Sequence, residues 1–542
     1  MTTILFELGT EELPPKNLKT LRDALESNVK TALTNGNIPF DSLKSYAAPR
    51  RIALQIIGVA EKAQDRIEVK KGLPIKDKTA LPQNFDKFFG KIYPNSVATG
   101  LTEFADNIAK NGFDTALAQY NEQLASNSAN LKLIIETIKN VEYLSVETQI
   151  KGKSIDEILP NMLQKALDDL PIAKRMRSGA SRDEFVRPVQ WVVLMADGKI
   201  IKATIQGHQA SDQTRGHRFH SPEFMPISHA NDYESILQNQ KVIADFDKRQ
   251  NLIKEQVQEL ADEVGATAIV PQALLDEVTA LVDYPVALRA SFEERFLQVP
   301  QEALISTMQA DQKYFCLTDK DGKLQPYFIF ISNSDSKDKS QVIAGNEKVV
   351  RPRLADAEFF FLQDQKRPLF ALTENLKTRV FQDKLGTIWE KSERVAKLAA
   401  FIATLTGADV EDTTRAAILS KCDLASTLVG EFPELQGVAG TYYARLNGEN
   451  PSVAAAIEEQ YLPKFSGDKL PATDIGTALA LADRIDTLVG IFGIEQAPTG
   501  SKDPFSLRRL AIGVLRISIE KQLPISLVAL IEQSLHSYKG KI

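Results

Sequence analysis

The chain has 542 residues, of which 43% are hydrophobic and 25% charged, which is typical of soluble globular proteins and excludes disordered and fibrous classes. This length is too great for a single hydrophobic core and predicts roughly three or four domains. The net charge of −6 argues against a small module that binds nucleic acid through bulk positive charge, so nucleic-acid binding would need local basic patches.

The cysteine content and the hydropathy of the sequence indicate the cellular compartment. Cys316 and Cys422 lie far apart and each lacks a second cysteine nearby, so neither a disulfide framework nor a thiolate metal cluster is expected. The N-terminus lacks the basic and long apolar segments of a secretory signal. No apolar run reaches the ~18 residues of a membrane span. We therefore expect a cytoplasmic protein without a membrane partner.

The N-terminal part alternates between strand and helix patterns. Residues 3–8 and 51–59 predict strands, and apolar residues at helical spacing from Leu18 to Leu33 predict a helix between them. Thr10 is expected to cap the acidic turn before that helix. Arg50 and Arg51 follow a proline at the start of the second strand. They could hold a phosphate, or they could be solvated strand ends or partners of acidic residues 11 and 12.

A less regular region follows at residues 72–145, rich in Asn, Gln and Ala. Its patterns predict helices at 105–118 and 126–141, so we interpret it as a helical insertion. Residues 154–170 predict another helix, which Pro171 ends.

The next segment is the most basic of the first half and contains Arg175, Arg177 and Arg182. It leads into a predicted strand at 189–195 and, through an Asp-Gly turn, a second strand at 200–205. The loop after this hairpin carries Arg215, His217, Arg218 and His220. A metal site there would need a third ligand that the spacing does not supply, so contact of Arg215 and Arg218 with RNA or with a protein interface is the more plausible hypothesis.

Residues 231–265, 271–281 and 301–311 predict helices, and 283–288, 313–317 and 325–332 predict strands, so this part is also α plus β. Beyond residue 346 the predicted elements are helical: 368–380, 391–406, 412–429, 451–461, 475–492 and 503–521.

Residues 343–361 mark the change between the two halves. This segment contains Lys348, Arg351 and Arg353 and ends in three phenylalanines, a mixture that fits a joint between domains. The phenylalanines are expected to anchor the helical half. The charges are either a solvated face cross-linked at helical spacing or contacts poised toward a partner.

The usual catalytic motifs are missing: no phosphate-binding loop, dinucleotide fingerprint, nucleophile elbow or zinc-protease motif occurs. One constellation resembles the metal site of HD-type phosphohydrolases, with Cys422 and Asp423 on one predicted helix and Asp483 and Asp486 on another. No histidine lies between residues 229 and 536, and Cys422 stands where the motif has its histidine, so no metal is expected. Carboxylates that bridge within a helical bundle are the favoured interpretation.

Near the end of the chain, Asp503 is a predicted N-cap and Pro504 a predicted first helical residue. Arg508 and Arg509 follow on the same helix. They could bind RNA phosphates, or they could be plain surface.

Long motifs along the chain resemble the β subunit of bacterial heterotetrameric glycyl-tRNA synthetase. They are LFELGTEELPP (5–15), APRR (48–51), RPVQW (187–191), TRGHRF (214–219), MQADQKYF (308–315), GNEKVVRPRLADAEFFF (345–361), LSKCDL (419–424) and KDPFSLRR (502–509). The resemblance spans essentially the whole chain, and only region 72–145 is poorly matched.

The resemblance implies a multidomain α+β protein: an N-terminal tRNA-binding region at 1–225, a B3/B4-like module at 226–342, and an all-α HD-like domain at 343–542, with the anticodon-binding domain of the family expected beyond the last residue. It also implies a non-catalytic subunit of an α2β2 enzyme that binds tRNA(Gly), while the α subunit holds ATP, magnesium and the active site. A metal-dependent HD phosphohydrolase and a tRNA-editing hydrolase are the alternatives.

Overall fold

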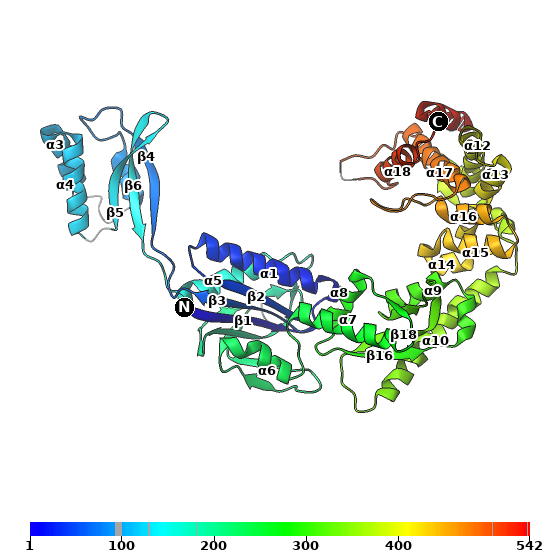
Figure 1. Cartoon of the computed structure of the whole chain (residues 1–542). Coiled ribbons are helices and arrows are strands. Elements are labelled where there is room, and N and C mark those ends of the chain that lie inside the picture. The colour runs from blue at the N-terminus through cyan, green and yellow to red at the C-terminus, as the bar shows by residue number, and fades with distance from the viewer. Residues whose placement is uncertain (93–99, 128–129, 180–181, 501, 539) are drawn as a thin grey trace. The chain divides into compact units, whose positions relative to one another are not determined.

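The computed structural model describes residues 1–92, 100–127, 130–179, 182–500, 502–538 and 540–542 (Figure 1). The fold is mixed α and β, as predicted. The chain divides into a first unit, Met1–Ile253 with Leu275–Pro285, and a second unit, Lys254–Leu274 with Val286–Ile542. The predicted domain boundaries at 225/226 and 342/343 stay predictions. None of the described helices is both long and apolar enough to cross a membrane.

A mixed sheet forms the centre of the first unit, in the strand order β11-β12-β9-β1-β3-β2. Its strands are β1 (Thr2–Thr10), β2 (Ser42–Ala48), β3 (Arg51–Val59), β9 (Val189–Ala196), β11 (Thr204–Ile205) and β12 (His208–Ser211). Strand β1 pairs antiparallel with both β3 and β9. The predicted hairpin is shorter than expected, because only β10 (Lys199–Ile200) returns along β9 and β11 pairs with β12 instead.

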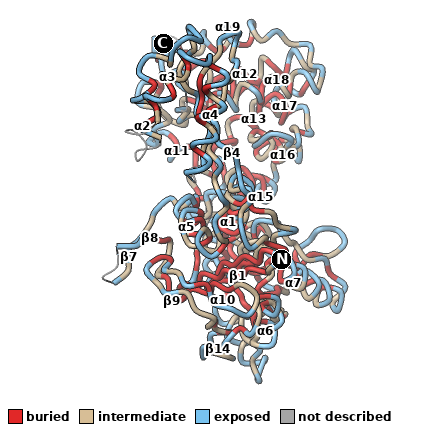
Figure 2. The backbone as a smooth tube through the Cα atoms, turned by 90° about the vertical axis from the view of Figure 1, so that its left-hand side faces the viewer, coloured by how far each residue is buried: buried red, intermediate tan, exposed pale blue. Residues whose placement is uncertain are grey.

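Helices cover both faces of this sheet, and the buried strands are the red centre of Figure 2. Helices α1 (Pro15–Asn35) and α5 (Ile155–Asp168) pack on one face, against Phe6 and Leu8 of β1. Helix α6 (Tyr233–Asn239) packs on the other face, against Leu5. Successive side chains of a strand point to opposite faces, so a strand that is buried on both faces is almost wholly apolar. In the centre of β1 the only charged residue is Glu7.

Residues 66–150 contain a three-stranded sheet with its own core. Strands β4 (Arg66–Pro74), β6 (Val141–Ile150) and β5 (Leu131–Ile138) accompany helices α2 (Phe85–Ile92), α3 (Leu101–Asn111) and α4 (Phe113–Ser126). The prediction of a helix over 126–141, and with it the purely helical insertion, is therefore wrong. Lys139 and Asn140 both have positive φ, so they form the tight two-residue turn that joins β5 to β6 as a hairpin.

The second unit begins as a four-stranded sheet with the order β15-β17-β18-β16. These strands are β15 (Thr267–Ile269), β16 (Val286–Ser291), β17 (Phe315–Thr318) and β18 (Leu324–Ser332). Helix α10 (Lys339–Asp364) follows, and one hydrophobic core continues from the sheet into the helices beyond it. Those helices include α12 (Ile388–Thr406), α13 (Val410–Leu419), α15 (Val438–Leu446), α16 (Pro451–Glu459), α17 (Asp474–Gly493), α18 (Leu507–Glu520) and α19 (Leu527–Ser537).

Several predicted boundaries are wrong for local reasons. The helical region at 231–265 is broken between α6 and α7 (Phe246–Asp262). The helix predicted at 368–380 is confirmed only as a 3-10 turn (Leu369–Leu372) and the short helix α11 (Thr373–Leu376), and the strand pair β19 (Val380–Gln382) and β20 (Gly386–Thr387) follows it. The N-cap of α1 is Pro14, because Thr10 still belongs to β1. Helix α18 starts three residues later than predicted. The carboxylate of Asp503 nevertheless accepts the backbone N–H groups of Leu507 and Arg508, at 2.8 and 3.0 Å.

Candidate functional site

Four of the arginines singled out from the sequence gather at one end of the first unit's sheet. We call this group the arginine cluster: Arg50, Arg51, Arg215 and Arg218. The guanidinium carbons of the first three lie 5.9, 5.6 and 6.0 Å from the centre of the Trp191 ring in β9. Gly9 in β1 makes room for this indole, because a Cβ at that position would lie 1.9 Å from it. The four arginines come from two segments that are more than 160 residues apart in the sequence.

Arg51 is the structural member of the arginine cluster. It is 2% exposed, and its Nη1 donates to Glu7 Oε2 at 3.1 Å and to Thr214 Oγ1 at 3.0 Å. Burial acts to lower the pKa of Arg51, but Glu7, Tyr233 and Asp283 together outweigh it and the pKa is raised. The predicted contact of Arg51 with RNA or an interface stays a prediction, and in this structure its guanidinium is directed toward Glu7 and Thr214. Its acidic partner is Glu7 and not residue 11 or 12, since Glu7 faces it from the adjacent strand.

The other three arginines keep capacity for an anion. Arg50 is 8% exposed, and its Nε has no hydrogen-bond partner among the described residues; the same holds for Nε of Arg215. Burial, and then the neighbouring Arg218, lower the pKa of Arg50. Arg218 is half exposed and ion-paired with Glu11 and Glu12. Buried guanidinium donors beside a further cation form a site that a phosphate group would stabilise.

The remaining basic residues singled out in the first unit lie elsewhere. Arg175 donates to the carbonyl oxygens of Leu167 and Asp168, at 3.1 and 2.7 Å, and so closes the end of α5. Arg177 pairs with Glu184 at 2.7 Å, and Arg182 is exposed. His217 is buried, and its Nδ1 accepts the backbone N–H groups of residues 219 and 220, which gives it a role in shaping the loop.

In the second unit, the basic residues at 348–353 lie on the exposed side of α10. Lys348 and Arg353 are exposed, whereas Arg351 pairs with Glu293 at 2.7 Å. Of the three phenylalanines that follow, Phe361 is buried but Phe359 is 61% exposed, so the run anchors the helical half only in part. On α18, Arg508 and Arg509 are exposed.

The acidic residues of the HD-like constellation lie close to cations. We call this group the helical charge cluster: Lys391, Arg394, Lys421, Asp423, Asp483 and Asp486. The ammonium groups of Lys391 and Lys421 lie 3.1 and 3.2 Å from Asp483 Oδ1. Burial acts to raise the pKa of Asp483, but these two lysines outweigh it and the pKa is lowered. Ammonium groups thus already occupy the carboxylate that a divalent cation would need.

Pairing between helices explains this arrangement. Lys391 and Arg394 are one turn apart on α12, as are Asp483 and Asp486 on α17, so the two pairs face each other. Cys422 is buried, and burial raises the pKa of its thiol to about 12, which leaves it a poor ligand or nucleophile. Lys391, Lys421 and Arg394 were not recognised from the sequence as partners of these carboxylates. The matching three-residue spacings were the available signal.

Asp423 makes the stability of the second unit depend on pH. Burial raises the pKa of this carboxyl to about 6, although the Gly437 and Gly440 amides and Lys421 act to lower it. The folded state therefore holds a proton that the unfolded state releases, so stability rises as pH falls. Between about pH 7.5 and about pH 5 we expect a gain of ~1.4 kcal/mol.

This gain is measured as urea unfolding of the wild type and of Asp423→Asn at both pH values. The variant should lack the gain, because it has no carboxyl to protonate, while all other titrating groups are common to both proteins. Equal pH dependence in the two proteins would contradict the assignment.

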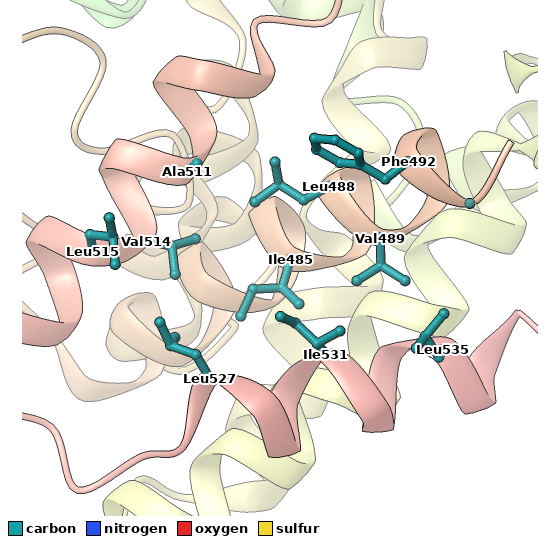
Figure 3. Close-up of a pocket in the computed structure, with 11 residues that line it drawn as sticks. Ile485, Leu488, Val489, Phe492, Ala511, Val514, Leu515, Leu527, Ile531 and Leu535 are labelled. Atoms are coloured by element: carbon teal, nitrogen blue, oxygen red, sulfur yellow. The ribbon is translucent and has the colours of Figure 1, made fainter. Parts of the chain in front are cut away.

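A second feature of the helical part is a wholly apolar cavity of about 520 Å³ between α17, α18 and α19 (Figure 3). It is lined by Ile485, Leu488, Val489, Phe492, Gly493, Ala511, Val514, Leu515, Leu527, Ile531 and Leu535. Such a lining offers surface for packing but no group for chemistry.

Comparison with known proteins agrees with the resemblance in the motifs. A family model described as "Glycyl-tRNA synthetase beta subunit" matches residues 4–92 and 99–541, including most of the region that the motifs left out. The chain is 56% identical over 536 residues to the "Glycine--tRNA ligase beta subunit" of Acinetobacter baylyi, covering 99% of this chain and 73% of that protein. It is 48% identical over 538 residues to the protein of the same name from Pseudomonas putida, covering 99% and 74%. The chain therefore belongs to the glycyl-tRNA synthetase beta subunit family.

Proposed function

We propose that this chain is the β subunit of a glycine–tRNA ligase, and that it binds and positions tRNA(Gly) for ATP-dependent glycylation at the active site of an α subunit. Family membership along nearly the whole chain supports this function. The observation that carries the RNA-binding part is the arginine cluster with its unpaired, buried guanidinium nitrogens. Neither hydrolase alternative gains support from the relatives.

The proposed contribution to catalysis is positioning. Holding the tRNA so that its terminal hydroxyl meets an activated glycine replaces a bimolecular encounter with an oriented one. In this proposal ATP and magnesium belong to the α subunit, the complex is an α2β2 heterotetramer, and it acts in the cytoplasm. Two buried, unpaired cysteines are in keeping with a reducing compartment.

We also propose that residues 226–342 form a B3/B4-like module and residues 343–542 an HD-like domain that serves a structural or RNA-docking role. The ion pairs of the helical charge cluster support a structural role for the second of these. Exposed cations are candidates for contact with tRNA or with the α subunit: Arg177, Arg182, Arg218, Lys348, Arg351, Arg353, Arg508 and Arg509.

Substitution of Arg215 is the most direct test of RNA binding. In the complex with the α subunit, Arg215→Gln should bind tRNA(Gly) ~10-fold more weakly and should lower the slope of log affinity against log salt by about 1, because one phosphate contact is lost. Fluorescence anisotropy with labelled tRNA(Gly) at several salt concentrations measures both quantities. Arg66→Gln, at an exposed arginine of β4, is the matched control and should bind as the wild type does. Unchanged affinity and slope for Arg215→Gln would contradict the phosphate contact.

A further inference from the structure

A cavity of about 470 Å³ lies within the second unit, beside the helical charge cluster. Pro463 and Leu510 form its apolar wall, and its polar lining consists of Glu434, Gln436, Gln460, Tyr461, Lys464, Asp483, Arg484 and Arg509. This volume falls in the range of small-molecule sites, which combine apolar walls with a few placed polar groups. None of these side chains has a part in the RNA contact proposed for the first unit.

Gln460 is the most specific feature of this cavity. Its side chain is 1% exposed, and its Nε2 donates to the carbonyl oxygens of Ser420 and Ile457, both at 2.7 Å. Because both partners are acceptors, the orientation of the amide is fixed and Oε1 points away from them. Oε1 is buried and has no hydrogen-bond partner among the described residues. A buried acceptor without a partner is costly, so this atom calls for a ligand N–H or O–H donor.

The charges in the cavity favour an anion. Lys464 and Arg509 are exposed at its rim, and Arg509 retains donors beyond the one bond of its Nη2 to Ser506 Oγ at 3.1 Å. Asp483 lines the cavity but is already paired with Lys391 and Lys421. Arg484 donates to three backbone carbonyl groups and adds a further positive charge. Glu434, the second carboxylate of the lining, accepts from Ser306 Oγ. The lining thus carries three cations, Lys464, Arg484 and Arg509, against two carboxylates, of which Asp483 is already ion-paired, so an anionic group at the rim meets an excess of positive charge.

We propose that this cavity binds a nucleoside monophosphate unit, with the phosphate at Arg509 and Lys464 and an N–H group of the base donating to Gln460 Oε1. A nucleotide combines what the lining requires: an anion at one end and, at the other, a flat, partly apolar ring with N–H donors. The unit can be a free nucleotide or an unpaired nucleotide of a tRNA, and only the second source rests on the function proposed above.

Calorimetric titration of the full chain with AMP tests the site. We expect measurable AMP binding, ~10-fold weaker binding for Arg509→Ala and for Lys464→Ala, and ~10-fold weaker binding of ribose 5-phosphate, which lacks the base. Arg445→Ala removes an exposed arginine of α15 outside the cavity and should leave AMP binding unchanged. Both rim residues are exposed, so the variants should fold, and circular dichroism verifies it. Absence of AMP binding to the folded wild type, or equal affinity for ribose 5-phosphate, would overturn the proposal.

Competition separates the two sources. If saturating AMP weakens tRNA(Gly) binding in the anisotropy assay, the site takes a tRNA nucleotide; if AMP binds and tRNA affinity stays the same, it takes a free nucleotide. Either result supports the site. A wild type that binds AMP but no tRNA would contradict the proposed function and leave the nucleotide site standing.

Discussion

Glu7→Ala is expected to lower the free energy of unfolding of the first unit by about 3–5 kcal/mol. Glu7 is fully buried in the middle of β1. Its carboxylate accepts from Arg51 Nη1 at 3.1 Å, Trp191 Nε1 at 2.5 Å, Thr214 Oγ1 at 2.6 Å and Tyr233 Oη at 2.5 Å. Alanine would remove the carboxylate that is ion-paired with the buried Arg51 guanidinium and would leave three further donors without this acceptor.

Tryptophan fluorescence can follow this unit by itself. The chain has two tryptophans, Trp191 in the first unit and Trp389 in the second, so in a Trp389→Phe background the urea transition reports on Trp191. Glu61→Ala removes an exposed carboxylate from the same unit and should leave the transition midpoint unchanged. Glu7→Gln keeps the shape but not the charge, and its midpoint should fall between those of the wild type and Glu7→Ala. A Glu7→Ala midpoint equal to that of the control would refute the role of Glu7 as the hub of this network.

Apolar patterns in the sequence predicted several of the buried elements well. The strand predicted at 51–59 coincides with β3 (Arg51–Val59), and helices α5 and α17 lie within two residues of their predicted limits. These segments have strong apolar patterns and clear end signals, so local sequence determines them. The hairpin β5–β6 was missed because its strands pair with each other and with β4, about 70 residues away, and residue-by-residue patterns do not carry such pairing.

The charged sites were harder to predict, because their partners are distant in sequence. Arg51 was singled out together with Arg50, but its acidic partner Glu7 lies 44 positions away in sequence, on the adjacent strand. The one carboxylate in the middle of an apolar strand was the available signal, since a buried charge requires a partner. Likewise, the acidic residues on α17 were recognised, but Lys391 lies more than 90 residues before them. A sequence shows that such charges exist, and only the packing of α12 against α17 shows that they neutralise each other.

That packing gives the second large effect. Asp486→Ala should destabilise the second unit by about 3–5 kcal/mol, because Asp486 is 1% exposed and pairs with Arg394 Nε at 2.8 Å and with Lys391 Nζ at 3.2 Å. Lys391 keeps Asp483 as a partner, whereas Arg394, which is 6% exposed, keeps no acidic ion-pair partner among the residues that the structure describes. The uncompensated guanidinium is thus the main source of the loss.

Hydrogen exchange measured by mass spectrometry resolves this effect by helix, and we expect faster exchange of the backbone amides of α12 and α17 in Asp486→Ala. Asp474→Ala, at an exposed position in the first turn of α17, is the control on the same helix and should change exchange far less. Adding Arg394→Met to Asp486→Ala should restore part of the protection, because an apolar side chain of similar length removes the buried charge. If the double variant exchanged faster than Asp486→Ala, the loss would come from packing of the arginine stem and not from its unpaired charge.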